Sequence, residues 1–172
     1  MKHFKISKQQ RYKKIIIKYI WMQIYKICIN KIVIKGKKTL AIKIFNEFIQ
    51  NINKLKFSWK IIICKCFLLI KPIVILKKFV KKFNDLLYPS LTSYEHELKL
   101  AAKWLIWGTK NRKNIKGPFS KKLTIEIFDI LNNKISNSKT FSLKKQYNEE
   151  IINCLPSFKV VSQLMRKRQK KW

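Results

Sequence analysis

The sequence predicts a mainly α-helical fold: a bundle of about six helices with one protruding basic β-hairpin between the third and fourth helices. Apolar residues recur at spacings of three and four in most segments, and polar breaks with glycine or proline separate those segments. Residues 73–91 instead mix β-branched and aromatic residues with lysines, which favours a hairpin with its turn near residues 83–85. With 172 residues, 47% of them hydrophobic, one domain is expected.

The N-terminal half is predicted to contain a basic arm, residues 1–19, followed by three helices. Gly36 is the expected stop signal of the first helix, whose stripe includes Ile20, Ile24, Ile27, Cys28, Lys31 and Ile34. Thr39 is expected to cap the second helix, with apolar positions Leu40, Ala41, Ile44, Phe45, Phe48 and Ile49. After the polar break NINKLKFS, Ser58 is expected to open a third helix that Pro72 ends.

The C-terminal half is predicted to contain three more helices. The fourth helix is expected from the apolar face Leu98, Ala101, Ala102, Leu105 and Ile106. After the break GPFSKK, the fifth is expected from Leu123, Ile127, Phe128, Ile130 and Leu131. The segment NNKISNSKTFS is predicted to be a loop, and residues 143–168 are predicted to be mostly helical. Residues 20–168 therefore form the predicted single helical domain, and residues 169–172 a basic C-terminal tail.

The charge of the chain points to a polyanionic partner. Lys and Arg total 40 against 8 acids, so the formal net charge is +32. Residues 1–84 carry 22 basic residues and one acid, Glu47. This balance excludes an ordinary enzyme surface, where the two signs are roughly matched, and the apolar content excludes a disordered basic tail. Nucleic acid is the first candidate partner.

Catalytic, cofactor and metal sites are not predicted. Cys64 and Cys66 are separated by one residue, without a CxxC or Cys/His pairing, so we interpret the cysteines as small apolar side chains. His3 and His96 are the only histidines, and the three glycines are too far apart to form a phosphate loop. We therefore expect a protein that is not an enzyme.

Two apolar runs, residues 15–34 and 61–76, raise the alternative of a membrane protein. Lysines interrupt both runs, and Pro72 interrupts the second, so neither reaches the roughly 20 apolar residues of a spanning helix. Each central lysine would cost about 2.5–3.5 kcal/mol on insertion scales. No membrane span is expected.

Two segments resemble a known family. The stretch CINKIVIKGKKTLAIKIFNEFIQNI resembles the first two helices of small-subunit ribosomal protein seven; Asn30, Gly36, Lys37 and Lys38 match its motif, whereas Lys35 replaces an acid. The stretch KPIVILKKFVKKFNDLLYPSLTSYEHELKLAAKWLIWGTKNRK is similar to the family's basic hairpin and following helix, with Pro72, Pro89 and Trp104 on family positions. The resemblance covers roughly residues 20–168.

The chain also departs from the family pattern. Its N-terminal segment is rich in lysine and isoleucine where the family has an arginine-rich arm. The two glycines of the family's hairpin tip are replaced around Lys82-Phe83, and Trp107-Gly108 interrupts a helix that is alanine-rich in the family.

The resemblance implies a structural protein of the small ribosomal subunit. Such a protein binds the 3′ major domain of the small-subunit rRNA, organises assembly of the head, and points its hairpin toward the exit-site tRNA and the mRNA exit path. The implied partners are rRNA, neighbouring head-region ribosomal proteins and, transiently, tRNA and mRNA. No homo-oligomer and no cofactor are expected.

The expected RNA contacts form three groups, which consist mostly of basic residues. The expected rRNA-binding residues are Arg11, Lys13, Lys14, Lys35, Lys37, Lys38, Lys103, Lys110, Arg112 and Lys113. On the hairpin, the residues expected near tRNA, mRNA or rRNA are Lys77, Lys78, Lys81, Lys82 and Phe83. The expected C-terminal contacts are Arg166, Lys167 and Arg168. Lysine acts as a point charge, so these contacts are expected to read RNA position and shape.

The bias toward lysine, isoleucine, asparagine and phenylalanine is typical of an A/T-rich coding sequence. We therefore expect an organellar ribosome in the mitochondrial matrix, with a plastid or a bacterial cytoplasm as the alternative. Two other functions stay open at this point. A small subunit of an organellar membrane complex would insert the two apolar runs, and a standalone nucleic-acid-binding regulator would bind a specific site when free.

Overall fold

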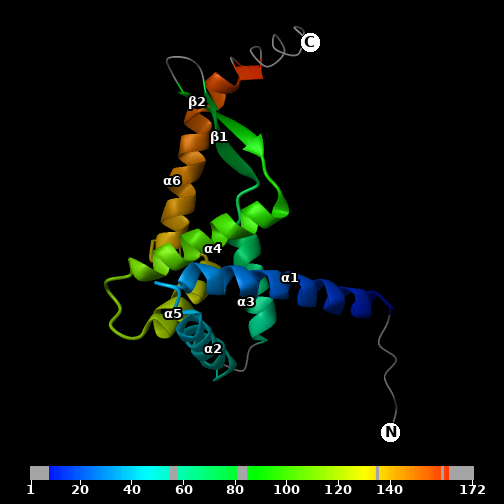
Figure 1. The fold of residues 1–172 in the computed structure, drawn as a ribbon, viewed down its shortest axis with the longest axis vertical. Coiled ribbons are helices and arrows are strands. Elements are labelled where there is room, and N and C mark those ends of the chain that lie inside the picture. The colour runs from blue at the N-terminus through cyan, green and yellow to red at the C-terminus, as the bar shows by residue number, and fades with distance from the viewer. Residues whose placement is uncertain (1–7, 55–57, 81–84, 135, 160, 163–172) are drawn as a thin grey trace.

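The computed structural model describes residues 8–54, 58–80, 85–134, 136–159 and 161–162 (Figure 1). Its elements follow the order α1 (Lys8–Ile32), α2 (Lys38–Lys54), α3 (Trp59–Ile70), β1 (Val74–Val80), β2 (Asp85–Leu91), α4 (Tyr94–Lys110), α5 (Phe119–Leu131) and α6 (Lys139–Asn153). A short helical stretch at residues 155–159 follows α6. The predicted fold class is confirmed: a mainly helical bundle with one two-stranded hairpin between α3 and α4.

Helix α1 begins earlier than the sequence predicted. It starts at Lys8, so residues 8–19 are helical and continuous with the predicted first helix. The helix ends at Ile32, and Gly36 lies in the turn after it with a φ of +76°. Lys35 beside it has a φ of +50°, and the Lys37 N–H donates to the Ile34 carbonyl at 3.1 Å. Positive φ at both central residues is typical of a type I′ turn.

Helix α2 begins one residue before the predicted cap. Thr39 lies within the first turn, because the helix starts at Lys38 and the Ala41 N–H donates to the Lys37 carbonyl. Leu40, Ile34 and Lys31 are exposed, unlike the other members of their predicted stripes. Ile34 lies beyond the end of α1, and Leu40 lies on the first turn of α2 beside the buried Ala41.

The core lies where α1 to α5 meet. The buried face of α2 comprises Ala41, Phe45, Phe48 and Ile52. Rings from three helices pack together there: Trp21 of α1 has its ring centroid 4.4 Å from Trp59 of α3 and 6.2 Å from Phe45. Each such side chain contributes roughly 1.5–3 kcal/mol when it leaves water. The predicted face of α2 included Ala41, Phe45 and Phe48 and omitted Ile52.

The hairpin extends away from the bundle beside α6 (Figure 1). Its antiparallel register pairs Val74 with Leu91 and Val80 with Asp85. Asp85 was expected in the turn and instead starts β2, so residues 81–84 connect the strands and lie outside the described residues. The Leu76 N–H donates to the Tyr147 hydroxyl at 3.0 Å, which anchors the base of the hairpin to α6.

Helix α6 begins inside the predicted loop. The Ser138 side chain accepts a hydrogen bond from the Phe141 N–H at 3.2 Å, so it caps the helix and allows it to start at Lys139. Gly108 does not interrupt α4, which continues to Lys110. Instead, a Cβ at Gly108 would collide with the Thr140 hydroxyl, so the missing side chain lets α4 and α6 approach closely.

A buried ionic network joins the segment just after α4, helix α5 and the start of α6. Glu126 on α5 is fully buried, and its Oε2 lies 2.8 Å from the Nε of Arg112. Its Oε1 accepts from the Ser138 hydroxyl at 2.7 Å, the Thr140 N–H at 3.0 Å and the Thr140 hydroxyl at 2.7 Å. Arg112 also pairs with Asp129 through its second nitrogen. The carboxylates and hydroxyls therefore hold three segments together.

Candidate nucleic-acid interface

The turn between α1 and α2 presents three lysines to solvent. Lys35, Lys37 and Lys38 are exposed, and none forms an ion pair with an acid among the described residues. The first turn of α2 also contains no acid. The N-terminus of a helix carries partial positive charge, so cations there are destabilising and an anion there is stabilising. The turn therefore suits a phosphate, which both the lysines and the helix would attract.

A second cationic face runs along α4. Lys99, Lys103 and Lys110 are exposed at spacings of four and seven, which place them on one face of the helix. Glu95 partly neutralises Lys99, with 2.7 Å between Oε1 and Nζ, whereas Lys103 and Lys110 have no acidic partner in the described part of the chain. The prediction omitted Lys99, although its spacing from Lys103 signalled the same face.

The two cationic regions each include the C-terminal end of a helix, and these two ends lie on one side of the molecule. Helices α1 and α4 pack against each other and run in the same direction (Figure 1). Their C-terminal ends therefore lie on the same side, so the turn after α1 and the end of α4 lie on that side too. This shared side follows from the helix packing.

The hairpin carries a third group of cations. Lys77 and Lys78 are exposed on β1, opposite Tyr88 and Leu87 of β2. Neighbouring residues of a strand point to opposite faces, so the hairpin presents one cation on each face. The group extends the cationic surface away from the bundle.

Several expected contacts cannot be placed with their side chains. Arg11, Lys13 and Lys14 lie on α1 where the backbone alone is described. Outside the described residues lie Lys81, Lys82, Phe83, Arg166, Lys167 and Arg168.

The prediction that Arg112 contacts RNA is not supported by its position in the structure. Arg112 was expected to contact RNA, but only 5% of it is exposed. Its guanidinium pairs with Glu126 and Asp129 and donates to the Asn137 carbonyl at 2.8 Å. The N–H donors of the guanidinium are therefore used inside the protein. Arg112 has a structural role and is not part of the candidate interface.

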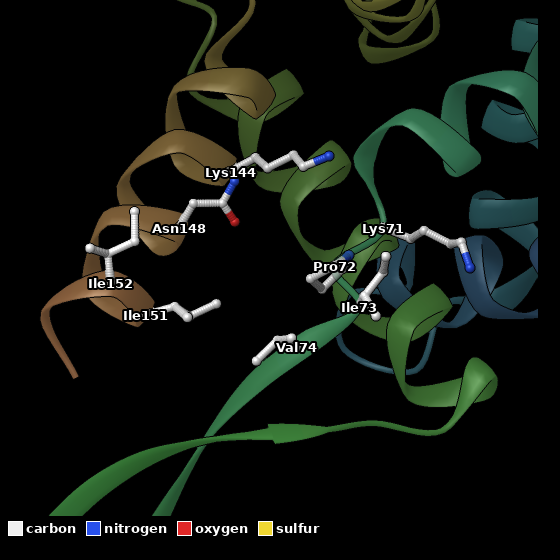
Figure 2. Close-up of a pocket in the computed structure, with 8 residues that line it drawn as sticks. All are labelled: Lys71, Pro72, Ile73, Val74, Lys144, Asn148, Ile151 and Ile152. Atoms are coloured by element: carbon white, nitrogen blue, oxygen red, sulfur yellow. The ribbon is translucent and has the colours of Figure 1, made fainter. Parts of the chain in front are cut away.

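A groove between β1 and α6 does not provide a chemical site. Figure 2 shows Val74 and Pro72 facing Ile151 of α6 across the groove, with the ammonium groups of Lys71 and Lys144 directed away from these apolar side chains. Lys71 pairs with Glu97 at 2.7 Å, and Lys144 donates to the Leu69 carbonyl. Burial lowers the pKa of Lys144. Both cations are thus engaged within the fold.

Metal ligands and membrane spans are also missing from the part of the chain that the structure describes. No group of three or more histidine, cysteine or carboxylate residues is arranged to hold a metal ion there. Within the same residues, every helix is too short or too polar to cross a bilayer.

The buried cysteines should be unreactive in the folded protein. Burial raises the pKa of the Cys28 thiol to about 12, and it raises the pKa of Cys66 as well. Because the thiolate is the nucleophile, iodoacetamide at pH 8 should modify the half-buried Cys154 well before Cys28 or Cys66. Peptide mass spectrometry measures the order, and modification in urea is the control. Equal rates for all cysteines without denaturant would contradict the described packing.

A comparison with models of known protein families gives a match. The family model described as "Ribosomal protein S7p/S5e" matches residues 1–150. No curated protein sequence matches the chain. The match covers most of the 172 residues, including α1 to α5, the hairpin and most of α6. The chain therefore belongs to the ribosomal protein S7p/S5e family, whose members are structural, non-enzymatic proteins that bind rRNA in the small ribosomal subunit.

Proposed function

We propose that this protein binds the 3′ major domain of the small-subunit rRNA and organises assembly of the head of the subunit. The observation that carries the proposal is the side of the molecule that includes both the α1–α2 turn and the end of α4. Lys35, Lys37 and Lys38 of that turn are exposed, as are Lys110 at the end of α4 and Lys113 just after it. A junction of RNA helices brings several phosphate backbones together, and such a surface can contact more than one of them.

The hairpin contacts a region of RNA different from the one that the bundle contacts. Lys77 and Lys78 lie on an element that extends beyond the bundle, so they can reach RNA at a distance from the main contact. We assign them, with Lys81, Lys82 and Phe83, to the region of the exit-site tRNA and the mRNA exit path. Arg11, Lys13, Lys14, Arg166, Lys167 and Arg168 remain proposed rRNA contacts on the N-terminal and C-terminal segments.

The proposed location is a mitochondrial ribosome, where neighbouring head-region proteins complete the surroundings. The composition supports it: 36 lysines against 4 arginines, with much isoleucine and asparagine, are typical of an A/T-rich organellar genome. A plastid or bacterial ribosome would share the same rRNA contacts and would differ in the fraction of the cell that contains the protein.

Sedimentation of an organelle lysate in detergent tests the proposal. The chain, followed by mass spectrometry, is expected to migrate with the small-subunit rRNA and to leave those fractions after RNase treatment. Migration with a membrane complex, unchanged by RNase, would contradict a ribosomal role. Enrichment in purified mitochondria over plastids or cytoplasm decides the location separately.

A further inference from the structure

Trp107 is an exposed aromatic residue within the cationic face of α4. Its side chain is 47% exposed. Lys103 precedes it by four residues and Lys110 follows it by three, so the helix places all three side chains on one face. Both lysines are exposed and have no acidic partner among the described residues. The face therefore combines one indole with two available cations.

The core does not use Trp107. Trp104, one turn earlier on α4, is 7% exposed and packs edge-on against Tyr147, with ring centroids 5.1 Å apart. Trp21 and Trp59 likewise pack against each other. In the part of the chain that the structure describes, Trp107 has no such aromatic neighbour. Its large ring therefore remains available to a partner outside the chain.

The positive charge around Trp107 favours an RNA base over a protein side chain as that partner. A neighbouring protein would have to bring acids to balance the flanking lysines, whereas RNA carries a phosphate at every nucleotide. An indole cannot enter the deep, narrow major groove of an RNA helix, but it can stack on a base of a loop or bulge. Such stacking is tolerant of sequence, because every base presents a π-face.

We propose that Trp107 stacks on an unpaired base of the small-subunit rRNA, while Lys103 and Lys110 contact the phosphates of the nucleotides that flank this base. This inference rests on the proposed function, because it requires that α4 faces the rRNA. It adds a base contact to an interface whose other described members are lysines. Trp107 therefore holds one particular nucleotide in place.

Binding of the full-length chain to a transcript of the 3′ domain of its own small-subunit rRNA tests this inference. Trp107→Ala should weaken binding by about 5- to 100-fold, the range expected for loss of one stacked base. Trp107→Leu should weaken it nearly as much, because leucine keeps apolar volume without a π-face, whereas Trp107→Phe should retain most of the affinity. Phe158→Ala is the matched control, since Phe158 is 46% exposed and lies in the helical stretch 155–159 beyond α6, outside α4.

Two further readouts separate stacking from a general weakening of the protein. Stacking releases no counterions, so Trp107→Ala should leave the salt dependence of binding unchanged, whereas Lys103→Gln should reduce its logarithmic slope by about 1. Chemical probing of the complex should show one base that is protected with the native chain and reactive with Trp107→Ala. The melting temperature of the variant should stay close to that of the native chain, because the side chain is outside the core.

The results can overturn the inference in distinct ways. If Trp107→Ala binds as tightly as the native chain, or if Trp107→Leu is as good as Trp107→Phe, Trp107 does not stack on a base. A loss of affinity with Phe158→Ala equal to that with Trp107→Ala would show a general apolar effect. If the native chain itself fails to bind the transcript, the proposed function fails first and the base contact fails with it.

Discussion

Glu126→Ala is expected to destabilise the folded chain by about 3–5 kcal/mol, because it breaks the buried ion pair between Glu126 and Arg112. Glu126 is fully buried, and its two oxygens contact Arg112, Ser138 and Thr140. Asp129 still pairs with Arg112 in the variant, but the hydroxyls and the Thr140 N–H lose their acceptor. Unsatisfied buried donors add to the loss.

Thermal and urea unfolding of the full chain measure this effect. For a protein of this size, a loss of 3–5 kcal/mol corresponds to a fall in melting temperature of about 6–20 °C. Glu150→Ala is the control, because Glu150 is exposed on α6 and surface substitutions usually change stability by less than about 0.5 kcal/mol. Equal stability of Glu126→Ala and Glu150→Ala would show that the network is not a structural centre of the fold.

The affinity of the chain for its rRNA is expected to fall by about 10³- to 10⁵-fold between 50 and 200 mM salt, the range for 6–10 phosphate contacts on duplex DNA. Eight exposed lysines of the candidate interface support this range: Lys35, Lys37, Lys38, Lys77, Lys78, Lys103, Lys110 and Lys113. Each phosphate contact releases counterions from the RNA, and added salt opposes that release. Filter binding over a salt series measures the slope.

A matched pair of triple variants locates the contacts. Replacing Lys35, Lys37 and Lys38 together by glutamine should reduce the logarithmic salt slope by about 2–3, since each phosphate contact contributes nearly one. Replacing Lys43, Lys54 and Lys121 by glutamine changes the net charge equally, and these exposed lysines lie outside the candidate interface. If both triple variants change the slope by the same amount, the binding depends on total charge and the α1–α2 turn is not a specific contact.

Helical periodicity explains why much of the fold could be predicted from the sequence. The spacing of Leu98, Ala101, Ala102, Leu105 and Ile106 identified the buried face of α4, because a helix returns to the same side every 3.6 residues. Ser58 and Pro72 marked the limits of α3 correctly. The start of α6 was missed, because the capping role of Ser138 depends on Glu126 and Thr140, which hold the segment in place.

The candidate interface, like the fold, could be predicted only in part from the sequence. The sequence by itself determined the family resemblance, the excess of cations and the segments that carry them, since these depend on composition and local order. Only the tertiary structure decided which cations are available to a partner. Arg112 and Lys110 are two residues apart, yet Arg112 lies against Asp129, seventeen residues further along the chain, whereas Lys110 is exposed. Trp104 and Trp107 differ likewise, because Trp104 packs against Tyr147 of α6, whereas Trp107 lies on the exposed face of α4. Burial depends on which segments meet in space, and that arrangement brings together residues that are distant in the sequence.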